Sequence, residues 1–231
     1  MTAFIASPKF KFVYLSIPKA GCTSVKNWIY RLENGHYLNE PLDIHKVERS
    51  HLVHFDTNRS QVYEAFRSSF VFTLVRHPLK RAYSLFTEKI LQQSQYAFGG
   101  VRRKLKDQYG ASLQIGGLDE CQSDFLAFLN FIRDTQRSKV DFRLDWHWIP
   151  QTAIVRDALK HRTIDFIGRV ETMDLDMQFV MDRTGATAIR FPRFNESPKV
   201  KYSYDDILTG RIGDIGRLIY EKHLENFAYA L

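Results

Sequence analysis

The chain has 231 residues, a length that suits one compact α/β domain with a sizeable core. Its apolar share of 44% and aromatic share of 14%, with 18 Phe and 11 Tyr, exclude an intrinsically disordered chain. Lys and Arg exceed Asp and Glu by 33 − 26 = 7, so the surface favours anionic partners such as nucleotide phosphates, acidic polysaccharides, nucleic acids or membrane faces.

Cysteine usage and hydropathy favour a soluble protein of a reducing compartment. The two cysteines, Cys22 and Cys121, are too few for a disulfide framework. The N-terminal stretch is interrupted by lysines and a proline and lacks the long apolar core of a signal peptide. No run reaches the roughly 18 apolar residues of a membrane-spanning helix. We therefore expect a cytoplasmic protein without a transmembrane segment.

The first predicted elements form a strand, a loop and a helix. Residues 10–17 are β-branched and aromatic and indicate a short buried strand halted by Pro18. Residues 19–24 are small and predict a loop. Residues 25–33 carry apolar side chains at helical spacing, and the following Asn-Gly pair predicts the end of that helix.

The middle of the chain begins with a second clear strand at residues 70–75. Pro78 is placed to open a helix that runs through residue 93, because proline is favoured in the first helical turn. Residues 96–121 contain three glycine sites and a basic cluster. We expect a mobile insertion there that meets the substrate.

The last third repeats the alternation of helix and strand. Ser123 is expected to cap a helix that runs through residue 135. Residues 165–170 predict a strand, and residues 174–184 predict a helix ended by Gly185. A final amphipathic helix is expected at residues 215–227.

Alternating strands and helices are typical of a mostly parallel sheet with helices on both faces. The sequence therefore predicts a doubly wound α/β fold with three α/β/α layers. We expect a single domain over residues 1–231, since no internal repeat and no low-complexity tract divides the chain.

The loop after the first strand has the composition of a phosphate-binding loop. Backbone N–H groups at the start of a helix and the helix dipole hold anions, and Gly21 removes the Cβ that would block a close approach. Thr23 and Ser24 add hydroxyl donors, and Lys19 adds a cation. The lysine precedes the glycine, so the loop is not a Walker-type P-loop. An ordinary strand-to-helix turn with polar caps remains the alternative.

A second anion-binding pair follows the strand at residues 70–75. Arg76 stands at the carboxyl end of this strand, and Ser84 lies eight residues later in the helix that Pro78 opens. An arginine and a serine so placed can hold a further phosphate. Each alone is more typical of a solvated surface residue, but with the first loop they indicate a ligand with two separated phosphates.

These two segments resemble the sulfotransferase superfamily, and specifically the carbohydrate sulfotransferases grouped as family 2. Residues 17–24, I-P-K-A-G-C-T-S, look like the family's 5′-phosphosulfate loop. Residues 75–84, V-R-H-P-L-K-R-A-Y-S, look like its 3′-phosphate motif R-[DH]-P-x-x-R-x-x-S. The resemblance continues in three later segments: residues 145–151, 165–173 and 220–229.

The resemblance implies a P-loop-like fold, 3′-phosphoadenosine 5′-phosphosulfate (PAPS) as sulfuryl donor, a hydroxyl-bearing acceptor that is a carbohydrate, and no metal. It implies that Lys19 stabilises the charge that grows on the leaving oxygen. It also implies a set of donor-binding residues: Lys19, Ala20, Gly21, Cys22, Thr23, Ser24, Arg76, Ser84, Arg169, Asn195 and Lys199.

The acceptor hydroxyl needs a general base. In the enzymes that the chain resembles this is often a histidine, or a glutamate, between the two phosphate motifs. His51 and His54 lie there, with Glu40 and Glu48 as further candidates. His147, between two tryptophans, is the rival to both histidines.

Two alternatives to a sulfotransferase stay open. A nucleotide-kinase-like phosphotransferase would need a lysine after the glycine and a carboxylate for magnesium, and neither is evident. A non-catalytic binder of acidic polysaccharide would keep the basic surface but not the combination of Lys19, Arg76 and Ser84. Nucleic-acid binding is not expected, because the sequence contains no recognised module.

Overall fold

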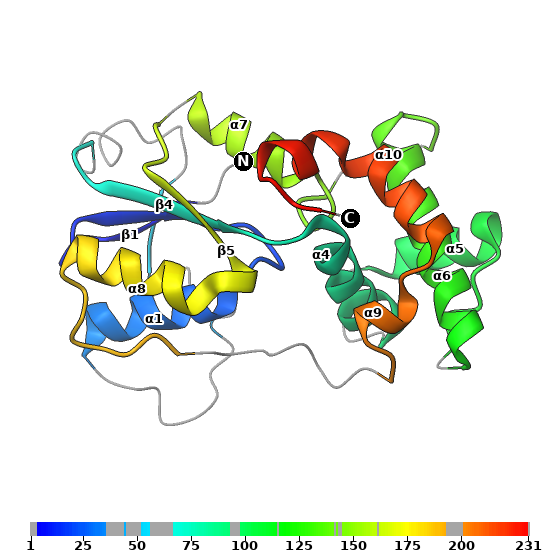
Figure 1. Ribbon diagram of the computed structural model, residues 1–231, viewed down its shortest axis with the longest axis horizontal. Coiled ribbons are helices and arrows are strands. Elements are labelled where there is room, and N and C mark those ends of the chain that lie inside the picture. The colour runs from blue at the N-terminus through cyan, green and yellow to red at the C-terminus, as the bar shows by residue number, and fades with distance from the viewer. Residues whose placement is uncertain are drawn as a thin grey trace. The chain divides into compact units, whose positions relative to one another are not determined.

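The computed structural model describes residues 4–35, 44, 52–55, 67–92, 98–114, 116–140, 142, 145–160, 162–192 and 201–230 (Figure 1). They form two compact units, Met1–Arg76 with Ala153–Glu196 and His77–Thr152 with Ser197–Leu231. Each unit thus takes two separate segments of the chain. The sequence predicts one domain over residues 1–231, and the division into two units does not test that prediction.

The first unit is built on a five-stranded sheet in the order β3-β1-β2-β4-β5. Its strands are β1 (Phe4–Ser7), β2 (Phe12–Leu15), β3 (Val53–Phe55), β4 (Phe70–Val75) and β5 (Phe166–Arg169). Strands β2, β4 and β5 pair in parallel, whereas β1 pairs antiparallel with both β2 and β3. Four strands therefore point in one direction, which confirms the predicted α/β fold with a mostly parallel sheet.

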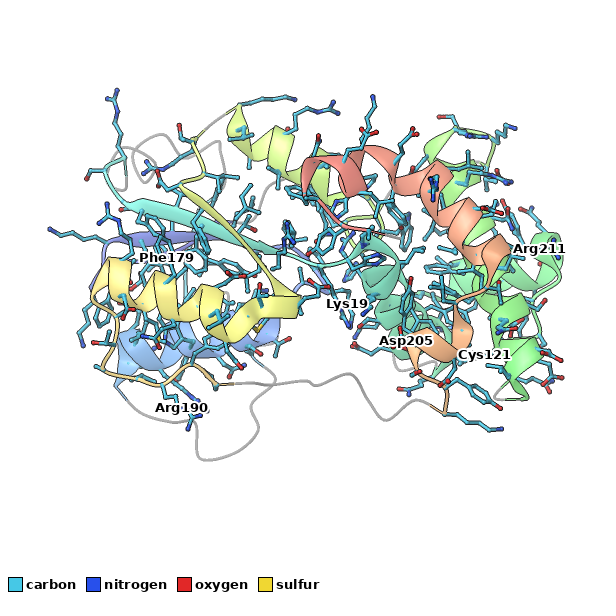
Figure 2. All side chains as sticks on the ribbon, viewed as in Figure 1. Lys19, Cys121, Phe179, Arg190, Asp205 and Arg211 are labelled. Carbon is cyan, nitrogen blue, oxygen red and sulfur yellow. The ribbon has the colours of Figure 1, made fainter. Side chains whose placement is uncertain are left out.

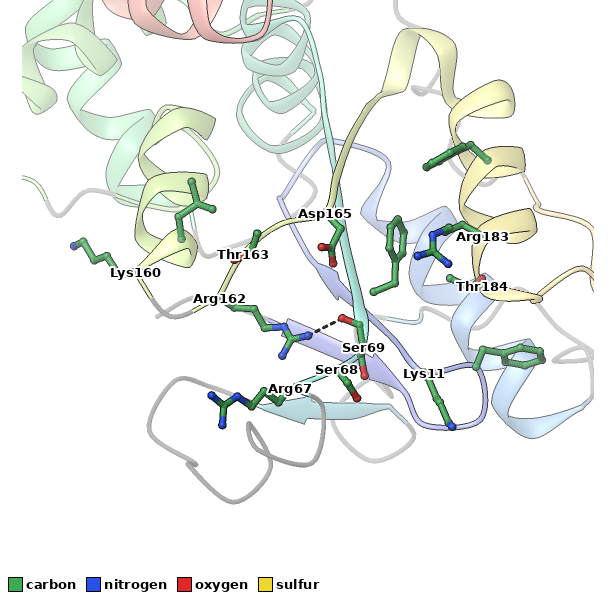
Figure 3. A pocket seen from close by; sticks show the side chains of 14 residues that line it. Lys11, Arg67, Ser68, Ser69, Lys160, Arg162, Thr163, Asp165, Arg183 and Thr184 are labelled. Carbon is green, nitrogen blue, oxygen red and sulfur yellow. Dashed lines mark hydrogen bonds between the residues drawn. The ribbon is translucent and has the colours of Figure 1, made fainter.

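Helices cover both faces of this sheet. Helices α1 (Cys22–Asn34) and α8 (Met173–Thr184) lie on one side and α7 (Gln151–Leu159) on the other (Figures 1 and 3). Trp28 of α1 is fully buried and stacks on Phe12 of β2 with ring centroids 5.2 Å apart, and its Nε1–H donates to the Ile189 carbonyl at 3.3 Å. Trp28 therefore belongs to the core of this unit.

The second unit is helical. Its elements are α4 (Pro78–Leu85), the π-helix η1 (Phe86–Leu91), α5 (Gly99–Tyr109), α6 (Leu118–Gln136), α9 (Tyr204–Ile207) and α10 (Gly210–Asn226). Buried aromatic rings of α4, η1 and α6 meet in its core, with Phe125 5.2 Å from Tyr83 and 5.5 Å from Phe86 between ring centroids. Pro78 opens α4 as predicted.

The described part of residues 96–121, which were predicted to form a mobile insertion, contains helix α5 and the start of α6. That this segment moves and meets the substrate stays a prediction. The α6 helix begins at Leu118 rather than at a cap on Ser123, because the Glu120 carboxylate accepts a hydrogen bond from the Gly117 N–H at 2.8 Å and closes the first turn.

The final helix also begins earlier than predicted. The Thr209 hydroxyl accepts a hydrogen bond from the Ile212 N–H at 3.4 Å, so α10 starts at Gly210. In contrast, α1 and α8 end at Gly35 and Gly185 as predicted, since both glycines adopt the left-handed conformation. Across the described segments, no helix combines the length and hydropathy needed to cross a membrane.

Candidate functional site

Three sequence-predicted segments meet at one edge of the sheet in the first unit. The parallel register pairs Leu15 of β2 with Thr73 of β4, and Val75 of β4 with Arg169 of β5. The loop after β2 and Arg76 consequently follow the carboxyl ends of β2 and β4, and Arg169 is the last residue of the neighbouring parallel strand β5. This is the edge where α/β sheets bind their ligands.

The loop after β2 has an unusual backbone. Lys19 and Gly21 both have positive φ angles, 64° and 72°, and the Ala20 N–H donates to the Ile17 carbonyl at 3.3 Å. A Cβ on Gly21 would lie 2.1 Å from Met173 Cε. The left-handed conformation therefore favours glycine here, and the end of the Met173 side chain fills the space that a Cβ would take. Figure 2 labels Lys19 in this loop.

The loop leads directly into the N-terminus of α1. Gly21 caps this helix without any side-chain hydrogen bond, and the first turn has no acidic residue. The Val25 N–H begins the helical ladder by donating to the Gly21 carbonyl at 3.2 Å, so the N–H groups of Cys22, Thr23 and Ser24 precede that ladder. This 13-residue helix and its dipole suit a phosphate group.

Arg76 joins this loop. Its Nη1–H donates to the Lys19 carbonyl at 3.5 Å, which brings the guanidinium of the second motif to the loop of the first. Arg169 lies next to it along the edge, and its backbone N–H donates to Asp176 Oδ2 at 2.7 Å. Asp176 also accepts the Thr172 hydroxyl at 2.6 Å and so fixes the turn after β5.

The remaining predicted residues lie elsewhere or outside the described residues. Ser84 is buried in α4 of the second unit. His51, Asn195 and Lys199, like Glu40 and Glu48, lie outside the described residues. The backbone of His54 belongs to β3 and pairs with Ile5, which in turn pairs with Tyr14 of β2. This places His54 two strands from β2, about 10 Å away, level with the carboxyl end of β2.

His147 of the second unit forms a hydrogen-bonded pair with Asp145. Its Nδ1 lies 2.5 Å from Asp145 Oδ1, and the same oxygen accepts the His147 backbone N–H at 2.9 Å. Because a carboxylate only accepts, Nδ1 donates and Nε2 of the neutral ring is the proton acceptor. The imidazole packs edge-on against Phe98 with centroids 5.5 Å apart. A carboxylate-oriented imidazole is suited to general-base chemistry.

Arg81 is a residue of this motif to which the sequence analysis assigned no role. Its side chain is 2% exposed and donates to the carbonyl oxygens of Ile149 at 2.8 Å and Trp146 at 2.7 Å. It therefore positions the segment that carries His147. Its place as the second arginine of the R-[DH]-P-x-x-R-x-x-S pattern was the available signal, but the pattern does not say which carbonyls the guanidinium binds.

Two further properties bear on chemistry. Cys22 and Cys121 are both free and buried, and burial raises the pKa of the Cys121 thiol, so it has no thiolate character at neutral pH. Within the part of the chain that the structure describes, no group of three His, Cys, Asp or Glu side chains is arranged to hold a metal ion.

The chain is similar to known proteins over most of its length. It matches the pattern of the Sulfotransferase family over residues 2–228. It is 25% identical over 194 residues to carbohydrate sulfotransferase 14 of Danio rerio, a match that covers 81% of this chain and 50% of that protein. It is 24% identical over 200 residues to carbohydrate sulfotransferase 11 of Mus musculus, covering 82% and 55%. The chain thus spans about half the length of these curated relatives. No solved structure matches it significantly.

Proposed function

The chain belongs to the sulfotransferase family, and from this premise we propose that it transfers a sulfuryl group from PAPS to a hydroxyl group of a carbohydrate. The observation that carries the proposal is the meeting of the α1 N-terminal loop, Arg76 and Arg169 at the carboxyl ends of three neighbouring parallel strands. The carbohydrate acceptor is supported by the relatives, which are named carbohydrate sulfotransferases.

The residues at this edge fit the donor. A 5′-phosphate needs a concave loop of N–H groups, and the left-handed Gly21, tight against Met173, provides one without a Cβ. A separate 3′-phosphate needs a cation at a neighbouring position, which Arg76 provides beside the Lys19 carbonyl. Ser84 is proposed as a further donor to the 3′-phosphate, and Asn195 and Lys199 as residues that close over the nucleotide.

When bound, PAPS supplies a sulfuryl group on a good leaving phosphate, so the protein mainly positions groups and stabilises charge. The α1 N-terminus holds the phosphate by its N–H groups and dipole. The Lys19 ammonium neutralises the negative charge that grows on the leaving oxygen as the sulfur–oxygen bond breaks. In this scheme no divalent cation has a role, because Lys19 carries the compensating charge.

A histidine takes the proton of the acceptor hydroxyl as the new oxygen–sulfur bond forms. His51 and His54 are proposed for this role from their position between the two phosphate motifs. His147 is the rival, and its pairing with Asp145 supports it because the carboxylate leaves Nε2 as proton acceptor.

The proposal is tested by incubating the protein with labelled PAPS and a panel of glycan, lipid and phenol acceptors. Label in glycans and not in phenols or lipids is the expected result. Label in phenols or lipids alone would refute the carbohydrate acceptor but leave the sulfotransferase assignment intact. Phosphate transfer from ATP, the expectation of a kinase-like enzyme, finds no support in the family to which the chain belongs.

A further inference from the structure

A polar cleft lies at the opposite edge of the same sheet from the candidate donor site, with a volume of about 1070 Å³ (Figure 3). It is bordered by the residues that precede β2, β4 and β5 and by the last turn of α8. Five cationic side chains line it: Lys11, Arg67, Lys160, Arg162 and Arg183. Asp165 is the one acidic residue among the described lining residues, so the lining carries 5 − 1 = 4 net positive charges.

Two of the five cations contact strand β4 or the residue before it, and Lys160 pairs with Asp157 at 3.4 Å between Nζ and Oδ1. Arg162 Nη2–H donates to the Ser69 carbonyl at 2.6 Å, just before β4. The Arg183 guanidinium lies over the Phe70 ring, 5.8 Å from its centroid. Anchored guanidinium groups lose less conformational entropy when they bind an anion than freely moving ones do.

The carboxylate of Asp165, the one acidic lining residue, accepts a hydrogen bond from the backbone of the sheet. Asp165 Oδ2 accepts the Val71 N–H at 2.7 Å, and the Asp165 N–H donates to the Val71 carbonyl at 2.8 Å. Asp165 therefore has a structural role at the start of β5, and the cleft as a whole favours anions.

The cleft also offers apolar surface. Phe179 and Leu159 line it and remain 48% and 51% exposed. An exposed aromatic ring next to cations suits a polymer that presents both anionic groups and apolar faces, and the pyranose rings of an acidic polysaccharide do so.

The position of the cleft separates it from the donor site. Ligands in α/β sheets react at the carboxyl ends of the strands, whereas this cleft lies at the amino ends. From Ser69 to Arg76 the chain takes seven residue steps along β4, about 23 Å at the rise of a strand. Figure 2 shows Phe179 on α8 in the left part of this unit and Lys19 at its right. A ligand must therefore span several sugar units to occupy both places.

We propose that this cleft is a remote binding site for an acidic stretch of the polysaccharide acceptor, so that it favours long anionic chains over short ones. The inference rests on the proposed carbohydrate acceptor. The site makes no contact with the reacting atoms and acts by holding the polymer.

The test is the triple variant Lys11→Glu/Lys160→Glu/Arg183→Glu, whose three side chains are exposed. Its control is Arg211→Glu/Arg217→Glu/Lys222→Glu on α10, which makes the same change of net charge at three exposed positions of the second unit. Thermal unfolding and 3′-phosphoadenosine 5′-phosphate binding check that both variants are folded. Binding to immobilised chondroitin sulfate is measured at several salt concentrations, with neutral dextran and a single-stranded RNA as comparison polymers.

We expect the triple variant to bind chondroitin sulfate on the order of tenfold more weakly or worse, with a shallower salt dependence, and the control to bind as the wild type does. Equal loss in both variants would refute a localised site. Tighter binding of RNA than of chondroitin sulfate, also abolished by the triple variant, would assign the cleft to nucleic acid and overturn the proposal.

Transfer activity separates this inference from the proposed function. With long and short acceptor chains, the triple variant should raise the KM for the long chain only and leave kcat unchanged. Normal transfer to long chains by the triple variant refutes the remote site and leaves the proposed function standing. Absence of transfer to any carbohydrate by the wild type, with cleft-dependent binding intact, refutes the proposed function instead.

Discussion

Replacement of Gly21 by alanine tests the donor loop most directly. Gly21 has a φ of 72°, and the left-handed conformation costs a residue with a Cβ about 1–2 kcal/mol. The new Cβ would also lie 2.1 Å from Met173 Cε, so the flexible end of this buried side chain must move to another rotamer, which adds about 0.5–1.5 kcal/mol. We expect the free energy of unfolding to fall by roughly 1.5–3.5 kcal/mol.

Gly35 provides a matched control at the other end of the same helix. Its φ is 71°, and a Cβ there would meet no atom within 4 Å. Gly35→Ala should therefore lose only the conformational part, about 1–2 kcal/mol. Urea unfolding of both variants measures the difference. In a Met173→Ala background the cost of Gly21→Ala should fall to that of Gly35→Ala, because the contact is gone.

The functional consequence is measured by calorimetry with 3′-phosphoadenosine 5′-phosphate. Gly21→Ala should weaken nucleotide binding, because the loop must change at the point where its N–H groups meet the phosphate. Gly35→Ala should bind normally. Equal stability losses in the two variants, with unchanged nucleotide affinity in Gly21→Ala, would refute the close-packed loop and its role.

Four further outcomes are expected. Arg76→Ala should weaken binding of 3′-phosphoadenosine 5′-phosphate by about 1.5–3 kcal/mol and leave AMP binding unchanged in calorimetry; an equal effect on both nucleotides would remove the 3′-phosphate role. Lys19→Met should lower kcat by roughly 10²–10³ with small changes in nucleotide affinity, and unchanged turnover would contradict charge stabilisation by the ammonium. Among alanine variants of His51, His54 and His147, the one that removes the base should lose about 10²–10⁴ in kcat while binding nucleotide normally, and three fully active variants would exclude a histidine base. Activity should survive EDTA, whereas loss restored by magnesium would speak for metal-dependent chemistry.

The sheet was predictable where local pattern and burial agree. Strand β4 has its predicted bounds because all six residues are β-branched, aromatic or leucine, and five of them are buried. Strand β1 was missed, since four residues between an unpatterned N-terminus and a Pro-Lys turn offer too short a signal. All four residues of β1 are buried in a sheet where β2 and β3 pair with it on either side. This burial depends on residues far away in the sequence, so the local pattern does not predict it.

Helix α5 shows why the glycine-rich segment at residues 96–121 was not predicted to be helical. Gly99 and Gly100 stand in its first turn, and only Gly110 ends it in the left-handed conformation. Its inward face holds just two buried residues, Val101 and Leu105, so the helical period is weak in the sequence. Packing against α6 stabilises α5, although the sequence of α5 alone does not predict a helix.

For the candidate donor site, the local structure of each motif was predictable from the sequence, but the contacts between the motifs were not. A strand followed by small residues and a helix is a local pattern, and it placed Lys19 and Gly21 in the loop before α1. The pairing of Val75 with Arg169 joins residues 94 positions apart and follows from the order of strands in the sheet. Likewise, the Asp145–His147 pair is close in sequence, but its orientation depends on the two carbonyls that Arg81 holds.

The excess of positive charge also shows what a sequence alone does not reveal about function. A net charge of +7 indicates anionic partners, but it does not say where on the surface they bind. The fold collects five cations from the ends of separate elements at the amino edge of the sheet, while Lys19 and Arg76 stand at its carboxyl edge. Because parallel strands keep these two edges apart, one sheet can hold a nucleotide at one end and a polyanion at the other without the two competing. In the proposed scheme, the polyanion bound at the amino edge therefore leaves the cations of the carboxyl edge to the nucleotide.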